Sequence, residues 1–167
     1  MLLAKQELSE LVAAYSRAVD RADQAALATL FHPGAISDSG VIRAPGDEFA
    51  RLFVAWVHEH AAALSHCVCS SWFDMRGGDE AVGETYVLAF CRLNERHGGG
   101  RSLTAGRYLD RFALREGRWK FTERRFVVDG VFPAAVAAES IERASATHGL
   151  GGFKPQDPIY EFWSARA

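Results

Sequence analysis

The stretch LVAAYSRAVDRADQAALATLFHPGA, residues 11–35, contains the signals that decide how the fold begins. Apolar residues within and just before it recur at steps of three, four and seven, the period of one helix face: Leu8, Leu11, Val12, Tyr15 and Val19. Asp23 is a good N-cap for a second helix. We therefore expect a long amphipathic helix that ends near Asp20, with a short helix directly after it.

The periodicity changes further along the chain. Pro45-Gly46 opens a third helix, whose alanine-rich end is AAALS at residues 61–65. From His66 onward the apolar residues alternate with period 2, as in strands. We expect strands at 67–75, 81–92, 103–114 and 119–128, and a short edge hairpin around Ser39-Gly40. Helices first and antiparallel strands afterwards indicate an α+β fold rather than a βαβ fold.

After Asp129-Gly130 the composition shifts. Residues 133–147 are alanine-rich with a helical pattern, and residues 159–163, IYEFW, are apolar and aromatic. A tail of this composition would not remain unsupported in water. We expect one domain at residues 1–130 and a C-terminal extension at 131–167, which covers either the pocket or a neighbouring subunit.

The composition is that of an ordinary globular domain, with 167 residues, 49% hydrophobic and 24% charged. The formal net charge of −2 provides no basic field for a nucleic-acid backbone. The sequence has no run of about 18 apolar residues, so we expect no membrane span. The N-terminus lacks the long apolar stretch of a secretory signal. Cys67, Cys69 and Cys91 lie in apolar runs and are expected to be reduced, buried thiols, which favours the cytoplasm.

The sequence contains no motif for a nucleotide, a metal ion or a serine nucleophile. GxGxxG, the P-loop, the serine elbow and zinc-binding patterns are all missing. His58 and His60 are two residues apart on a helix, so they do not face each other as metal ligands would. We therefore expect neither a cofactor nor a metal.

Three residues could carry acid–base chemistry, although each alone is more typical of a core or surface position. Tyr15 and Asp20 are five residues apart, about 140° around an ideal helix, and converge only if the helix unwinds at Asp20. The cap at Asp23 predicts that it does. A carboxylate there could accept the N–H of the His66 ring and raise its basicity. The phenol of Tyr15 could donate a proton or hydrogen bond to a carbonyl or a leaving hydroxyl.

Two segments of the chain resemble the SnoaL-like family of the nuclear transport factor 2-like superfamily. The first is residues 11–35, quoted above, and the second is GRYLDRFALREGRWKFTERR, residues 106–125. The second segment is similar to the closing hairpin of the family, in which Gly-x-Tyr-x-Asp/Glu precedes a Gly-x-Trp turn. The resemblance implies a cone-shaped half-barrel, in which a curved, mostly antiparallel sheet wraps around a long N-terminal helix and encloses a pocket.

Within the superfamily, the chain resembles bile-acid 7α-dehydratase, hexachlorocyclohexane dehydrochlorinase and scytalone dehydratase, which use an Asp–His pair to remove a proton while a group leaves. The resemblance places Asp20 and His66 at that pair. Tyr15 matches a tyrosine of the bile-acid dehydratase pattern, and Arg124 matches an arginine that the dehydrochlorinase uses near its leaving group. Ala89 stands where the bile-acid enzyme has an acidic residue, which is a departure from that pattern.

The residues and the resemblance together favour a cofactor-free lyase or isomerase of the dehydratase or dehydrohalogenase type. His66 would act as the base and Asp20 would orient it, while Tyr15 and Arg124 would polarise or protonate oxygen. The substrate is expected to be small and mostly apolar, with cyclic compounds included. The residues expected to contact it are Phe49, Phe53, Trp56, Tyr86, Val87, Ala89, Tyr108, Phe126 and Val128.

The alternative is a non-catalytic binding module for a small molecule, or an accessory subunit, with the same fold. It predicts that Asp20 and His66 lie out of hydrogen-bond reach or that side chains fill the pocket. In either case the resemblance implies a homo-oligomer, a trimer or a dimer. No nucleic-acid or membrane partner is expected.

Overall fold

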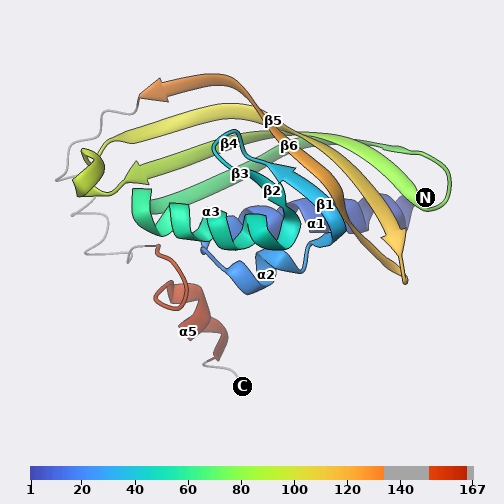
Figure 1. Ribbon diagram of the computed structural model, residues 1–167, viewed down its shortest axis with the longest axis horizontal. Helices are drawn as coiled ribbons and strands as arrows, with labels where there is room; N and C mark the ends of the chain where they lie inside the picture. The colour runs from blue at the N-terminus through green and yellow to red at the C-terminus, as the bar shows by residue number, and fades with distance from the viewer. Residues whose placement is uncertain (134–150, 165–167) are drawn as a thin grey trace.

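The computed structural model of the protein describes residues 1–133 and 151–164 (Figure 1). The helices are α1 (Leu2–Asp20), α2 (Gln24–Ala28), α3 (Gly46–His60) and α5 (Pro158–Ser164), with a 3-10 turn at Glu95–His97. The strands are β1 (Phe31–Asp38), β2 (Arg43–Pro45), β3 (Ala61–Met75), β4 (Glu80–Leu93), β5 (Arg101–Arg115) and β6 (Arg118–Pro133). The helix expected at 133–147 lies outside the described residues, except for Pro133, which ends β6.

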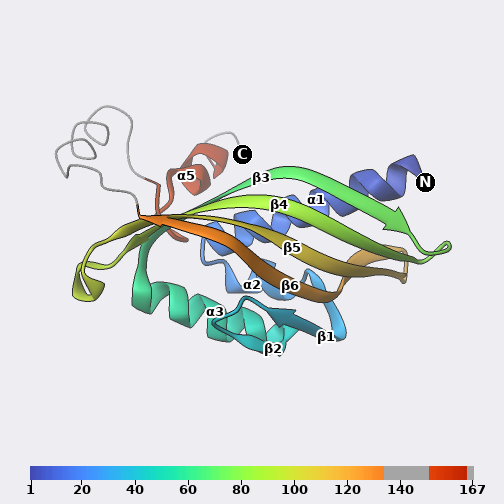
Figure 2. The same ribbon diagram turned by 90° about the horizontal axis from the view of Figure 1, so that it is seen from above.

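The six strands form one curved sheet in the order β2-β1-β6-β5-β4-β3. All neighbours are antiparallel except β1 and β6, which are parallel. The sheet arches over α1, α2 and α3, which lie together on its inner side (Figures 1 and 2). In this arrangement α1 packs against β3 and β6, and α3 packs against β1 and β2. The predicted α+β half-barrel around a long N-terminal helix is therefore confirmed.

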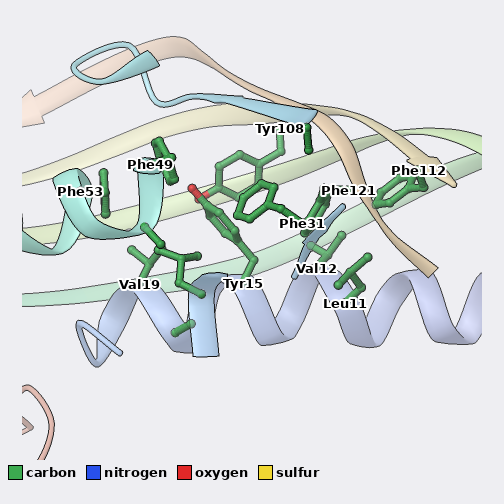
Figure 3. Close-up of a cluster of buried hydrophobic side chains, with 14 of the residues drawn as sticks. Leu11, Val12, Tyr15, Val19, Phe31, Phe49, Phe53, Tyr108, Phe112 and Phe121 are labelled. Atoms are coloured by element: carbon green, nitrogen blue, oxygen red, sulfur yellow. The ribbon is translucent and has the colours of Figure 1, made fainter. Parts of the chain in front are cut away.

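An aromatic cluster joins α1 to the inner face of the sheet (Figure 3). The ring of Tyr15 on α1 lies 5.5 Å from that of Tyr108 on β5 and 6.0 Å from that of Phe121 on β6. Phe31 on β1 lies 5.5 Å from Phe121, measured between ring centroids. Edge-on and tilted aromatic pairs each add about 0.5–1.5 kcal/mol to the stabilisation that comes from area burial. This cluster fixes the position of Tyr15 within the cone.

A glycine in β5 allows the last two strands to approach closely. A Cβ atom on Gly106 would lie 2.5 Å from the carbonyl oxygen of Val127 and 2.7 Å from the ring of Phe126. Because backbone cannot move aside as a side chain can, no other residue fits there without a shift of β6. Gly106 therefore sets the position of Phe126 on the inner face.

The hairpin of β5 and β6 departs from simple alternation near its turn. Simple alternation placed Lys120 and Thr122 on the same face as Arg124, and Phe121 on the other face. The register shifts between Arg111 and Phe112, so Phe121 is fully buried on the inner face together with Arg124. An extra residue in one strand of a pair reverses the alternation beyond it. Simple alternation therefore fails on the turn side of the bulge.

Strand β3 starts earlier than its sequence suggested. The AAALS sequence predicts the end of a helix, with the strand beginning near His66, because alanine is the best helix former. The structure shows Ala61 paired with Leu93, and Leu64 paired with Cys91, on β4. Pairing with a neighbouring strand outweighs a local helix propensity of this size.

The outer face of the sheet is not covered by α1, α2 or α3 (Figure 1). Its strands leave large apolar side chains substantially exposed, among them Trp72, Tyr86, Phe90, Leu109 and Phe132. Cys67 and Cys69 are also exposed, and Cys91 is half-buried. The expectation that all three thiols are buried was wrong, because residues 67 and 69 of β3 point away from the helices.

No helix in residues 1–133 or 151–164 is long and apolar enough to cross a membrane. The described part of the C-terminal extension, residues 151–164, lies beside the C-terminal end of α1. Its backbone is joined there by a hydrogen bond of 2.8 Å from Lys154 N–H to the carbonyl oxygen of Arg21.

Candidate active site

The first site residue lies at the point where α1 ends. Asp20 is the last residue of the helix, and Ala22 takes a left-handed conformation with φ of 49°. Asp23 then caps α2 by accepting a hydrogen bond of 3.2 Å from the N–H of Ala26. The helix therefore unwinds directly after Asp20, as the cap predicted, and its carboxylate can turn toward the sheet.

The carboxylate of Asp20 binds His66 of β3 through both of its oxygens. Oδ1 lies 2.5 Å from Nδ1 of the imidazole, and Oδ2 accepts a hydrogen bond of 2.9 Å from the backbone N–H of His66. The two side chains are only 13% and 11% exposed. A carboxylate acceptor at Nδ1 holds the proton on that nitrogen and leaves Nε2 as the basic nitrogen of the neutral ring.

His66 opens onto a cavity of about 270 Å³ between the helices and the inner face of the sheet. Among the residues expected to contact a substrate, six line this cavity: Phe53, Trp56, Ala89, Tyr108, Phe126 and Val128. Tyr15 and Arg124 line it as well, while Asp20 lies behind His66. The cavity is neither filled nor separated from the Asp20–His66 pair, so the structure does not match what the alternative predicted.

Three of the expected contact residues lie elsewhere. Phe49 is fully buried in the core between Phe31 and Phe53. Val87 is buried on the inner face of β4 but is not part of the cavity wall, and Tyr86 is 50% exposed on the outer face. Adjacent residues of a strand point to opposite faces, so Tyr86 and Val87 cannot both face one pocket.

Sequence reasoning missed several cavity residues, which come from the edge hairpin, α1, β3, β4, β5 and β6: Val19, Asp38, Ser39, Val41, Leu64, Cys91, Thr104 and Val131. Cys91 lies two residues after Ala89 on β4, and Thr104 lies four residues before Tyr108 on β5. Alternation along a strand therefore places Cys91 and Thr104 on the same face as these two expected contact residues. The edge hairpin gave no such signal, because its position relative to the sheet depends on the parallel pairing of β1 with β6.

Arg124 forms the second charged pair of the site. Its Nε and Nη2 donate to the two oxygens of Asp110, at 2.8 and 2.7 Å, and both side chains are almost completely buried. The guanidinium carbon lies 4.1 Å from the ring centroids of Tyr15, Tyr108 and Phe121. Nη1 is buried and has no hydrogen-bond partner among the described residues.

The charges of this cluster follow from its burial. Although burial acts against the cation, the pKa of Arg124 is raised above its usual value by Asp110. Burial raises the pKa of Asp110, and Arg124 opposes that shift. Two groups this close hold each other in their ionised forms, since an opposite charge favours ionisation of both. Asp110 was not singled out from the sequence, although it alternates with Tyr108 along β5.

The two tyrosines of the cavity remain neutral phenols. Burial raises the pKa of Tyr15 to about 12, with Arg124 acting in the opposite direction. Burial also raises the pKa of Tyr108 well above its usual value. Tyr15 is therefore a hydrogen-bond donor at neutral pH and not a base.

A metal site is not evident in residues 1–133 and 151–164, where no three His, Cys, Asp or Glu side chains come close enough to share an ion. The cavity therefore offers two kinds of group to a bound molecule. One is the ring nitrogen of His66, and the other is the donor set of Arg124 and Tyr15.

The profile of the SnoaL-like domain family matches residues 1–125. No curated protein sequence was found to match the chain. Among solved structures, the chain is similar to the type 2 hexachlorocyclohexane dehydrochlorinase LinA, with a TM-score of 0.75 and 22% identity over 81% of this chain and 92% of the other. The type 3 LinA from Novosphingobium barchaimii LL02 gives a TM-score of 0.74 at 22% identity, covering 81% and 93% of the two chains.

A scytalone dehydratase-like protein from Novosphingobium aromaticivorans DSM 12444 is also similar, with a TM-score of 0.70 and 22% identity over 82% of this chain and 91% of the other. At this level of identity the likeness shows a shared fold, and the family itself is shown by the SnoaL-like profile over residues 1–125. The resemblance inferred from residues 11–35 and 106–125 is thereby confirmed.

Proposed function

The chain belongs to the SnoaL-like domain family, and we propose that it is a cofactor-free lyase or isomerase that uses His66 and Asp20 for acid–base catalysis. One observation carries the proposal: the carboxylate of Asp20 lies 2.5 Å from Nδ1 of a histidine that lines the cavity. A binding module has no need of a nearly buried carboxylate that orients an imidazole. A general base needs it, because the carboxylate stabilises the imidazolium that proton transfer creates.

In an elimination, Nε2 of His66 would take a proton from a carbon of the substrate. The electrons of that C–H bond form the new double bond, and the leaving group departs with its own bonding pair. The phenol of Tyr15 is the donor available to a leaving oxygen or halide, or to a carbonyl oxygen, and the guanidinium of Arg124, 4.1 Å from the Tyr15 ring, adds positive charge beside it. In an isomerisation, the proton on His66 would return to another carbon of the same molecule.

The cavity sets the class of substrate. Its walls are mainly apolar and aromatic, with Val19, Phe53, Trp56, Phe126 and Val128 among them, and its volume is about 270 Å³. Apolar walls with a few placed polar groups are typical of sites for small organic molecules. We therefore propose a small, mostly apolar substrate, including cyclic compounds. Two of the similar structures, a dehydrochlorinase and a scytalone dehydratase-like protein, have names that agree with this class.

The test is turnover by His66→Ala, with His97→Ala as the matched control. His97 is a partly exposed histidine that does not line the cavity. A panel of β-hydroxy ketones, hydroxylated steroids and chlorinated rings is screened on the wild type first. For a panel member that turns over, His66→Ala should lower kcat by about 10²–10⁴-fold with little change in ligand affinity. Asp20→Asn should be similarly severe, and Tyr15→Phe milder.

Two outcomes would contradict the proposal. If His66→Ala turns over a substrate as fast as His97→Ala does, His66 is not the base. If no panel member turns over in the wild type while one of them binds tightly, the protein is a binding module instead.

We also propose that the protein is a homo-oligomer, a trimer or a dimer, assembled through the exposed apolar side chains of the outer sheet face. Arg107 lies at the centre of that face and is neutralised by Glu84 and Asp129, with N···O distances of 2.8 and 2.9 Å. A second copy would therefore meet an apolar surface with no unpaired charge at that point.

Since its three cysteines are free, we propose that the protein acts in the reducing cytoplasm.

A further inference from the structure

The C-terminal segment, residues 151–164, is bound to the turn that directly follows Asp20. Besides the backbone bond from Lys154 to Arg21, Nζ of Lys154 lies 2.7 Å from Oδ2 of Asp23. On the other side of the turn, Nε of Arg21 lies 3.2 Å from Oδ1 of Asp157. The segment thus contacts the first and third residues after Asp20.

Asp157 is built to hold this position. It is 4% exposed, and its carboxylate accepts hydrogen bonds from the backbone N–H groups of Gly152 at 2.9 Å and Ile159 at 3.0 Å. Although burial opposes it, these bonds and Arg21 lower the pKa of Asp157. Its charge is therefore present at neutral pH, and its geometry is fixed by its own segment before Arg21 is added.

The same segment contacts the last turn of α1. The guanidinium of Arg17 lies 4.7 Å from the ring centroid of Trp163 and 6.0 Å from that of Tyr160. Arg17 is one turn before Arg21, and its carbonyl oxygen accepts the Arg21 N–H at 3.1 Å. The helix end that presents Asp20 is therefore held at Arg17, three residues before it, and at Arg21 and Asp23 after it.

The turn itself needs such support. Ala22 has a φ of 49°, a conformation that residues with a Cβ rarely adopt. Strained backbone of this kind persists only where the surroundings determine it more than once. The contacts of Lys154 with Arg21 and Asp23, on either side of Ala22, are one such constraint. The hydrogen bond of 2.9 Å from the N–H of Asp23 to the carbonyl oxygen of Ala18 is another.

We propose that residues 151–164 are a positioning element for Asp20, in which Lys154 and Asp157 fix the turn so that the carboxylate meets His66. The element lies beyond residues 1–125, the part of the chain that matches the family profile. Its importance for catalysis rests on the function proposed above. Its test reads the Asp20–His66 hydrogen bond itself and needs no substrate.

The experiment uses the full chain with ¹⁵N-labelled histidine and measures solvent exchange of the ring Nδ1 proton of His66 by NMR. The variants are Lys154→Met and Asp157→Asn. The control is Lys5→Met, the same change in a partly exposed lysine near the other end of α1. We expect both variants to exchange about fivefold faster than the wild type, the factor that an ion pair worth about 1 kcal/mol controls. Lys5→Met should match the wild type, and Lys154→Arg should restore slow exchange.

The outcomes separate the two proposals. Equal exchange rates in Lys154→Met and Lys5→Met would show that the segment does not position Asp20, and would leave the role of His66 in catalysis intact. A wild-type His66 ring proton without protection would show that the Asp20 bond is absent, which contradicts the proposed base. Asp157→Asn also removes a buried charge and can unfold the chain. If circular dichroism shows that this variant is unfolded, the test rests on Lys154→Met alone.

Discussion

The buried pair of Asp110 and Arg124 offers the sharpest test of how the inner face is built. The change is Asp110→Asn, which keeps the size of the side chain and removes its charge. Arg124 would then be a cation with 1% of its side chain exposed and no counter-charge within hydrogen-bond distance in the described residues. The expected result is a large loss of stability.

The magnitude follows from the contacts. Removing one partner of a buried ion pair costs about 3–5 kcal/mol, because the remaining charge stays buried without compensation. Three aromatic rings lie 4.1 Å from the guanidinium and retain part of its stabilisation, and the asparagine oxygen can still accept one hydrogen bond. We therefore expect the lower end, about 3 kcal/mol, which for a domain of this size lowers Tm by about 6–12 °C.

The assay is urea unfolding followed by circular dichroism, with Glu123→Gln as the control. Glu123 pairs with Arg111 at 3.1 Å on the same two strands, but those side chains are 51% and 68% exposed. An exposed pair of this kind contributes no more than about 1 kcal/mol. The double variant Asp110→Leu/Arg124→Met, which removes both charges, should recover most of the loss. If Asp110→Asn is no less stable than Glu123→Gln, the pair is not buried as described and the reasoning fails.

Two further predictions concern pH and assembly. Unfolded chains ionise their phenols near pH 10, whereas in the folded chain the pKa of Tyr15 is about 12 and that of Tyr108 is also raised. The unfolded state therefore loses its phenol protons at lower pH than the folded state does. As a result, the free energy of unfolding should fall between about pH 10 and 12. Urea unfolding in that range, together with the ultraviolet absorbance of tyrosinate, checks this. Ionisation of all four phenols of the chain near pH 10 without unfolding would contradict it. For assembly, Trp72→Glu on the outer sheet face should convert the oligomer to a monomer in light scattering, while Leu3→Glu, at an exposed position on α1, should not. A wild-type chain that is monomeric at micromolar concentration would refute the oligomer.

The sequence predicted the fold and the two ends of the Asp20–His66 contact because these depend on local signals. The cap at Asp23 ends α1 at Asp20, and the change of period marks β3 as the strand that carries His66. The bulge near Phe112 was not predicted, since one extra residue leaves the composition of a strand unchanged. The exposure of Cys67 was also missed, because an apolar run does not reveal whether a second layer covers it.

Contacts between distant segments were beyond sequence reasoning. Lys154 and Asp23 are 131 residues apart, and nothing in either neighbourhood indicates the other. The pairing of Asp110 with Arg124 was within reach, because alternation places both on one face of a hairpin. The resemblance implies a role for Arg124 at the leaving group and says nothing of a carboxylate that pairs with it.

The two carboxylates of the site have comparable roles toward their cationic partners. Asp20 occupies Nδ1 of His66, and Asp110 occupies Nε and Nη2 of Arg124. Nε2 of His66 is left to accept a proton, and the guanidinium of Arg124 lies 4.1 Å from the ring of Tyr15, whose phenol is the donor at the cavity. A molecule in the cavity would thus meet a base and a donor, the combination that an elimination needs, because negative charge develops on the leaving group as the base removes the proton. The proposed function therefore requires both carboxylates, so Asp110→Asn should also reduce turnover in any variant background that stays folded.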